Sequence, residues 1–488
     1  MTERNEQTFD FQALGKRKLQ ADFSGGHLSN EGGLLLISQL DQRLGITDQL
    51  SKCFADYRDQ RYVEHSLHEL LRQRLYGLVA GYEDLNDHEV LRRDPLFAAA
   101  VGKSDPLGEH RVGEDKGHPL AGKSTLNRLE ITNARTQNGD APTHYHKIHA
   151  NHTKLEKTLI ALGTQALPQD THEIILDFDA TDDLIHGNQE GRYFHGYYRN
   201  YCYLPLYAFV GDIPFYAKLR TCDRDGCDGT VEALESIVAQ LRNRFPQARI
   251  IVRGDSGFAR EPIMKWCEDH GCYYCVGMAK NARLNKLLEP AMIKARETAC
   301  LTGGFACKFH DFTYQTANDS WSCKRRLIGK AEIIRGKENP RYVVTNLPAE
   351  QWPEEGALLK TGINDFSAEG LYRGVYCGRG DMENRIKEQQ LDMFADRTSS
   401  AALASNQLRL WFSTIGYLFM QQLRAQALRG TELAKATAGT IRQRLLKVAA
   451  SIRVSVRRVH VRLCSAFVRC EVFAQAHARI QRLPAPNY

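Results

Sequence analysis

Apolar residues recur at helical spacing through the first third of the chain. From residue 64 to 97 they fall every three or four positions, and Asn86 or Asp87 suits a cap between two helices. The same spacing returns between 126 and 162, behind a polar stretch rich in Gly and His. We therefore predict a mostly helical N-terminal region over residues 1–167.

After Pro168 the apolar residues form short runs that are typical of strands. EIILDFDA is followed by YLPLYAFV and IPFYAKLR, which form a hairpin around Gly211-Asp212. A helical pattern then ends at Pro246, before the buried strand ARIIVRGD, and this helix supplies the crossover that a parallel strand needs. A second helix and the strand CYYCVGM complete the mixed α/β order of a ribonuclease H-like core over 168–278.

The next segment, residues 279–360, carries further short strand candidates. FHDFTYQ, KRRLIGKAEII and RYVVTNL are separated by turn residues at Gly303-Gly304 and Asn339-Pro340. We interpret this segment as a β-rich insertion into the core. Helical spacing returns from Asp381, so residues 361–430 are predicted to form the second part of the core.

The C-terminal segment, residues 431–488, is the most basic part of the chain. Between Arg442 and Arg482 it has ten Lys or Arg residues and one acid. Within it, IRVSVRRVHVRL alternates apolar and polar residues, with a frame shift that a β-bulge could absorb. The alternation turns three basic side chains outward, either to contact DNA or to form a solvated strand face: Arg453, Arg457 and Arg462.

Bulk composition excludes some classes of protein. The 488-residue chain has a formal charge of +7, which permits a polyanionic partner without requiring one. It shows no apolar leader and no run of about 18 apolar residues, so we expect a cytoplasmic protein without membrane contact. The thirteen cysteines suit free thiols. One group of candidate zinc ligands is clustered in the sequence: Cys267, His270, Cys272 and Cys275. A zinc site is not expected there, because structural zinc sites usually present two separated pairs of ligands.

Two carboxylates stand on one face of the first predicted core strand. Side chains alternate along a strand, so Asp177 and Asp179 project together while Phe178 points to the other face. Buried carboxylates repel each other unless a cation or hydrogen bonds compensate. Asp255 directly follows the strand IIVRG. If that strand pairs beside the first, Asp179 and Asp255 come together. The alternative for Asp255 is a turn or cap role.

A metal ion between Asp179 and Asp255 would supply the compensating charge. Such a site needs a third acid, because Mg²⁺ takes oxygen ligands in octahedral geometry and paired ions share bridging carboxylates. The segment YCGRGDMENRIKEQQ offers one. Its two interior glycines are expected to delay the helix start. On a helix, four of its side chains fall on one face: Tyr376, Arg379, Glu383 and Lys387. The alternative is a surface ladder of ion pairs along that face.

These residues together resemble the DDE transposases of bacterial insertion sequences, in the branch whose third acid lies in a Tyr-x₂-Arg-x₃-Glu-x₆-Lys signature. Tyr376, Arg379 and Glu383 match that spacing. The closing lysine of the signature falls at Gln390 in this chain. Lys387, one turn earlier on the same helix face, could take its place.

The first two acids of that family also have counterparts here. The family's Asp-x-Thr element matches Asp179-Ala180-Thr181, which favours Asp179 over Asp177 as the first acid, and its second acid matches Asp255 in GDSGF. The resemblance implies that Asp179, Asp255 and Glu383 are catalytic. It also implies that they hold two Mg²⁺ ions, for which Mn²⁺ could substitute.

The resemblance further implies partners. The substrate would be double-stranded DNA, both the terminal inverted repeats of the element and the target, and a homodimer is expected in the DNA complex at the bacterial nucleoid. The N-terminal helical region would bind the element end, while Tyr376 and Arg379 would orient phosphate oxygens. Trp321, in the insertion, is a candidate to stack on a flipped base, with a core or turn tryptophan as the alternative.

Other functions compete with transposition. A stand-alone ribonuclease H-like nuclease would use the same three acids without recognising DNA ends. A catalytically inactive DNA-binding relic of a transposon would retain them as remnants. GHPLAGKS, residues 117–124, fits a phosphate-binding loop letter by letter, but no buried strand precedes it, so ATP binding is not expected.

Overall fold

The computed structural model describes residues 8–131, 147–316, 320–350, 363 and 365–485. The chain divides into two compact units. The first unit combines the chain up to Ile131 with the stretch that ends at His149 and the chain from Phe419 onward. The second unit holds Ala150–Leu418, so the predicted boundary at Pro168 lies inside it.

Helices make up most of the first unit. They include α1 (Leu34–Leu44), α2 (Ile46–Ser51), α3 (Leu67–Ala80), α4 (His88–Leu91), α5 (Pro95–Val101), α6 (Lys123–Glu130), α14 (Ala438–Ile441) and α15 (Cys470–Gln481). Helix α3 begins with a capping box in which Ser66 and Glu69 each accept a hydrogen bond from the other's backbone amide. The buried Glu31 pairs with Lys447 at 2.6 Å, which ties the N-terminal part of the unit to its C-terminal part.

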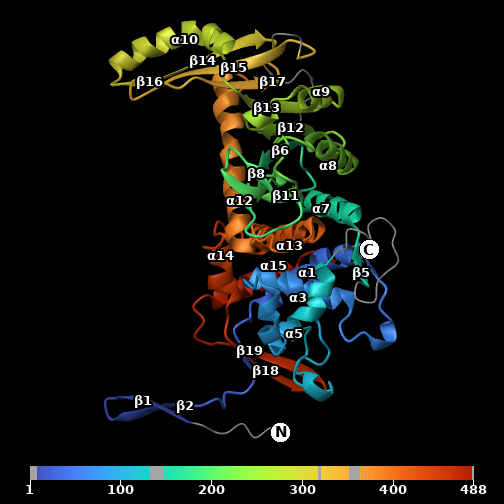
Figure 1. The fold of residues 1–488 in the computed structure, drawn as a ribbon. Helices are drawn as coiled ribbons and strands as arrows, with labels where there is room; N and C mark the ends of the chain where they lie inside the picture. The colour runs from blue at the N-terminus through green and yellow to red at the C-terminus, as the bar shows by residue number, and fades with distance from the viewer. Residues whose placement is uncertain (1–7, 132–146, 317–319, 351–362, 364, 486–488) are drawn as a thin grey trace. The chain divides into compact units, whose positions relative to one another are not determined.

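The basic C-terminal segment of the first unit forms a hairpin. β18 (Ala450–Ser455) and β19 (Arg458–Leu463) pair antiparallel, and β3 (Leu28–Ser29) pairs with β18. A two-residue turn replaces the predicted bulge, because Ser455 pairs directly with Arg458 and the alternation restarts in the second strand. A second hairpin, β1 (Phe9–Leu14) with β2 (Arg17–Ala21), is exposed along its whole length and was not predicted (Figure 1).

One mixed sheet forms the core of the second unit, in the order β11-β10-β6-β12-β13-β17-β15-β14. Its strands are β6 (Glu173–Ala180), β10 (Leu206–Val210), β11 (Ile213–Lys218), β12 (Arg249–Gly254), β13 (Tyr273–Met278), β14 (Phe305–Tyr314), β15 (Arg325–Ile334) and β17 (Arg341–Thr345). β6, β12 and β13 run parallel, whereas β10 and β17 pair antiparallel on either side of them. The predicted mixed α/β class is confirmed.

The helices that pack against this sheet include α7 (His152–Ala166), α8 (Thr230–Arg244) and α9 (Glu261–Asp269). α7 lies so close to β11 that a Cβ on Gly163 would come within 3.0 Å of the carbonyl oxygen of Pro214. This close approach explains why the second unit starts before the predicted boundary: α7 belongs with the sheet that follows it. The hairpin at Gly211-Asp212 forms as predicted, with Gly211 at a φ of 57°.

The segment predicted as a β-rich insertion also contains a long helix, α10 (Ala282–Leu301), which packs beside β14 and β15 (Figure 1). Strand patterns miss it, and Pro290 inside it removes one helical hydrogen bond. Burial of Leu284, Leu288 and Met292 in the main core offsets that loss. β17 pairs with β13, so the strands of this segment extend the core sheet.

The chain returns to the core through α11 (Ala368–Gly370), a π-helical turn (Leu371–Val375) and a 3₁₀ turn (Tyr376–Arg379). It continues as α12 (Gly380–Met393) and α13 (Leu403–Gln422). The α-helix itself starts at Gly380, directly after the π-helical and 3₁₀ turns. None of the described helices is long and apolar enough to cross a membrane.

Candidate active site

Asp179 and Asp255 lie at the carboxyl ends of neighbouring parallel strands. β6 and β12 pair in parallel, with Asp177 level with Arg253. Two residues further along, the same register carries Asp179 to the level of Asp255, which follows the last residue of β12. Strand pairing thus brings together the first two acids singled out from the sequence.

Asp177 has a different partner. Its buried carboxylate forms a two-pronged ion pair with Nε and Nη2 of Arg253. Nη1 of the same guanidinium donates to the carbonyl oxygen of Val375 at 2.5 Å. A Cβ on Gly378 would lie 2.6 Å from this nitrogen, so a glycine there leaves room for the arginine. Asp177 and Arg253 therefore connect the first core strand to the turn that precedes α12.

The environment of Asp179 is that of a partly buried carboxylate among other acids. Its side chain is 17% exposed, and Nη1 of Arg379 lies 3.6 Å from Oδ2. Burial raises the pKa of Asp179 to about 6 against the opposing charge of Arg379, and the charges of Asp255 and Glu383 act in the same direction as burial. The three acids are close enough for their charges to interact, which is the repulsion that a bound cation would relieve.

Asp255 caps the turn that follows its strand. Its Oδ1 accepts a hydrogen bond from the backbone amide of Gly257 at 2.8 Å. β13 comes so close that a Cβ on Gly277 would lie 2.9 Å from the Ser256 nitrogen and 2.6 Å from the Tyr376 hydroxyl. Burial raises the pKa of Tyr376, with Arg379 opposing and Asp255 adding to the effect. The tyrosine hydroxyl therefore stands beside the second acid.

Glu383 lies on α12 with its side chain 55% exposed, and its Oε1 accepts from Nζ of Lys387 at 2.9 Å. This hydrogen bond lowers the pKa of Glu383. Part of the predicted ion-pair ladder is thus formed. Among the described residues, no three His, Cys, Asp or Glu side chains are gathered tightly enough to hold a metal ion. Gln390, where the signature has lysine, reaches the carbonyl oxygen of Asp182 at 3.4 Å.

The family described as Transposase DDE domain group 1 matches residues 11–485. The chain belongs to this family. Membership implies an enzyme that cuts DNA and transfers strands with the help of divalent metal ions. No curated protein matches the sequence. A similar solved structure is that of the piggyBac transposase synaptic complex with hairpin DNA, with 10% identity and a TM-score of 0.39, covering 94% of this chain and 86% of that chain.

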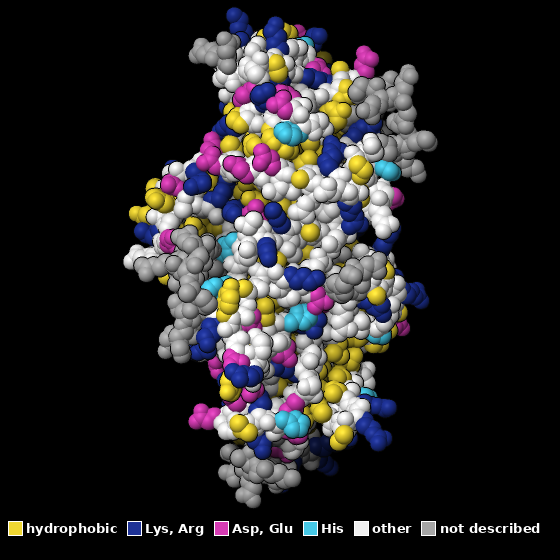
Figure 2. Space-filling view, turned by 90° about the vertical axis from the view of Figure 1, so that its right-hand side faces the viewer, with side chains coloured by type: hydrophobic (Ala, Val, Ile, Leu, Met, Phe, Trp, Pro, Cys, Tyr) yellow, Lys and Arg dark blue, Asp and Glu magenta, His cyan; other side chains and the backbone are white. Residues whose placement is uncertain are grey.

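Three of the basic residues singled out in this DDE transposase for DNA contact lie in its first unit. Arg453, Arg457 and Arg462 are exposed on the β18–β19 hairpin. The register sets Arg453 opposite His460 and Arg462 opposite Ser451, so these side chains share the polar face of the hairpin. Among the described residues on the face shown in Figure 2, Lys and Arg side chains are interspersed with Asp and Glu side chains.

Trp321, the candidate for stacking on a flipped base, is buried in the second unit. Its ring meets that of Tyr314 edge to face at 5.7 Å, and the guanidinium of Arg325 lies 5.4 Å from its centre. These are the surroundings of a core tryptophan, the alternative stated from the sequence. In this conformation no face of the ring is open to a base.

Asp183 is a buried acid that the sequence reasoning passed over. It lies in the short strand β7 (Asp183–Leu184), four residues after Asp179. Burial raises its pKa to about 8, and the charge of Asp396 adds to the shift. The two consecutive acids Asp182 and Asp183 could have drawn attention in the sequence. Only the burial of Asp183 in the structure distinguishes it from Asp182.

Asp183→Asn is expected to flatten the pH dependence of stability. The folded pKa of about 8 exceeds the ordinary 3.8, so the folded state keeps a proton that the unfolded state has released. The stability from this group is complete below the unfolded pKa and is lost as the pH rises through the folded one. Urea midpoints measured across this window should fall less in the variant than in wild type. The exposed Asp170→Asn is the control, and equal slopes in wild type and Asp183→Asn would contradict the assignment.

Proposed function

We propose that this chain is the transposase of a bacterial insertion sequence, in the branch with the Tyr-Arg-Glu-Lys signature. Its ribonuclease H-like core would cleave DNA at the ends of the element and join the freed ends to target DNA. The observation that carries the proposal is the pairing of Asp179 with Asp255 at the ends of adjacent parallel strands. Glu383 lies near enough to raise the pKa of Asp179.

Asp179, Asp255 and Glu383 would hold two Mg²⁺ ions, which Mn²⁺ could replace. Their donors are all carboxylate oxygens, which hard cations prefer. To join the site, the Glu383 carboxylate must break its ion pair with Lys387. Breaking an exposed ion pair of this kind costs at most about 1 kcal/mol. When bound, the ions would polarise the phosphodiester and lower the pKa of the attacking water.

Arg379 and Tyr376 would position the phosphodiester. Arg379 offers a fork of donors beside Asp179, and Tyr376 places a hydroxyl beside Asp255. A water molecule would attack first and release a 3′ hydroxyl, which then attacks the target strand. Because both nucleophiles are oxygens of water or DNA, the residues only bind and orient, and no covalent protein intermediate is required.

The DNA partners would be the terminal inverted repeats and the target duplex, held by a homodimer that gathers two ends. A stand-alone nuclease with the same acids would cleave but would yield no strand-transfer product. An inactive relic would bind DNA and do neither. The product pattern therefore separates the three functions.

Chelation of the divalent ions is expected to stop both reactions while DNA binding persists. The purified chain is incubated with the ends of its own element and a target plasmid, with Mg²⁺ or with EDTA, and products are resolved on a gel. Cleavage products and joined products should appear only when Mg²⁺ or Mn²⁺ is present. Cleavage that continues in EDTA would contradict the metal assignment, and cleavage without joining would favour the nuclease.

A further inference from the structure

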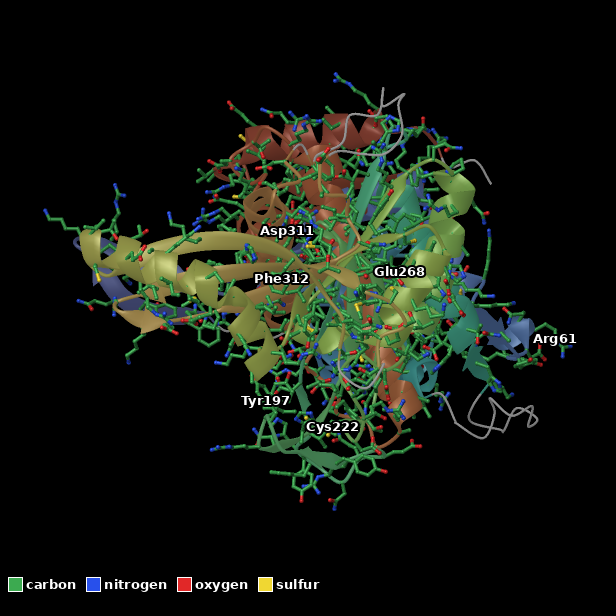
Figure 3. The ribbon with its side chains drawn as sticks, turned by 90° about the horizontal axis from the view of Figure 1, so that it is seen from above. Arg61, Tyr197, Cys222, Glu268, Asp311 and Phe312 are labelled. Atoms are coloured by element: carbon green, nitrogen blue, oxygen red, sulfur yellow. The ribbon has the colours of Figure 1, made fainter. Side chains whose placement is uncertain are left out.

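A short hairpin beside the acids is unusually rich in exposed aromatic rings. It consists of β8 (Tyr193–His195), β9 (Asn200–Tyr203) and the loop between them. Between Gly191 and Tyr203 the sequence has six Tyr or Phe, two Arg and no acid. We call this segment the aromatic hairpin. Figure 3 labels Tyr197 in this segment.

Several rings of the aromatic hairpin are left open to solvent. Tyr197 is 84% exposed, Phe194 58% and Tyr201 41%. Single exposed apolar side chains are common, but a contiguous group of large ones marks a binding surface. The exposure therefore needs a partner.

One face of the aromatic hairpin gathers planar side chains. Phe194 pairs with Tyr201 across the strands, and their rings meet edge to face with centres 5.5 Å apart. The guanidinium of Arg192 lies over the Tyr201 ring, 3.4 Å from its centre. On the opposite face Cys202 packs in a buried cluster with Leu204 and Cys222, and Tyr193 pairs across from it. Phe194, Tyr201 and Arg192 therefore gather on the open face.

The aromatic hairpin is anchored next to the candidate active site. β9 pairs with β7, which follows directly on the strand that carries Asp179. Burial raises the pKa of Tyr198, and the charges of Asp182 and Asp179 add to that shift. A strand of DNA that reaches Asp179 therefore also comes within reach of the hairpin.

We propose that the aromatic hairpin stacks on unpaired nucleobases of the DNA strand held at the acids. The surface matches that partner: bases stack on aromatic rings and on guanidinium planes, and two arginines without an acid suit a polyanion. A second protein chain would have no particular need for this charge. The inference rests on the proposed DNA substrate but does not depend on the acids being catalytic.

The test measures binding of a labelled oligothymidylate of roughly 12 nucleotides to the full chain, by fluorescence anisotropy without divalent ions. Phe194→Ala and Tyr197→Ala are each expected to weaken binding roughly 5- to 100-fold, the effect of losing one stacked ring. Tyr197→Phe, which keeps the ring, should bind like wild type. Phe305→Ala, which removes a similarly exposed ring from β14, is the matched control.

Unchanged affinity in both alanine variants would overturn the inference. So would a loss of self-association in these variants, measured by sedimentation, with oligothymidylate binding intact, since that result would make the hairpin a protein interface. Cleavage by the wild-type chain is scored separately with Mg²⁺. The proposed function can therefore fail while the hairpin still binds bases, and the hairpin can fail while cleavage stands.

Discussion

Asp255→Ala is expected to lower DNA cleavage by at least about 10³-fold, because losing a ligand to a catalytic metal removes several kcal/mol of transition-state stabilisation. The side chain lies at a strand end, beside Asp179 and the Tyr376 hydroxyl, and its Oδ1 accepts a hydrogen bond from the backbone amide of Gly257. Loss of one cap costs about 1 kcal/mol, so the variant should stay folded. Cleavage and DNA binding are measured on the same preparation.

The matched control is Asp269→Ala, an exposed acid that pairs with Lys265 on α9. It should cleave like wild type, because an exposed ion pair contributes little. Asp179→Ala should behave like Asp255→Ala. Cleavage at the wild-type rate in a folded Asp255→Ala variant would remove this acid from the site.

Arg253→Met is expected to destabilise the second unit by about 3–5 kcal/mol, since it leaves the buried carboxylate of Asp177 without its counter-ion. The substitution also removes the hydrogen bond to Val375, which holds the turn before α12. We therefore expect a lower urea midpoint together with weaker cleavage. Urea unfolding monitored by circular dichroism gives the first quantity.

Two further variants test the cause of that loss. Asp177→Leu combined with Arg253→Met removes both charges, and the double variant should recover much of the stability because no buried ion remains unpaired. Arg373→Met breaks an exposed pair with Glu369 and should change stability by less than about 0.5 kcal/mol. A double variant no more stable than Arg253→Met would show that the buried charge is not the cause.

Much of the second unit could be predicted from the sequence, because its signals are local. Alternation marks β6 as a strand, an apolar run marks β12, and helical spacing marks α8. The hairpin at Gly211 follows from the backbone freedom of glycine, which permits its φ of 57°. Because Asp255 directly follows β12, its position at the carboxyl-terminal end of that strand was also predictable.

Signals that depend on distant partners could not be predicted. Helix α10 contains a proline, and only its packing against the sheet compensates. Trp321 is buried by contacts with Tyr314 and Arg325, which no spacing rule reveals. The N-terminal and C-terminal parts share one unit through pairs such as Glu31 with Lys447.

The sequence by itself determined which strands carry the acids, since period-two alternation puts Asp177 and Asp179 on one face. The tertiary structure gives the two acids different partners. Parallel pairing sets Arg253 beside Asp177 and neutralises it, while Asp179 stands beside Asp255. The pairing of β9 with β7 also sets the exposed rings of the aromatic hairpin near Asp179. The physical reason is that charge pairing and burial depend on strand register, which brings together residues far apart in the chain.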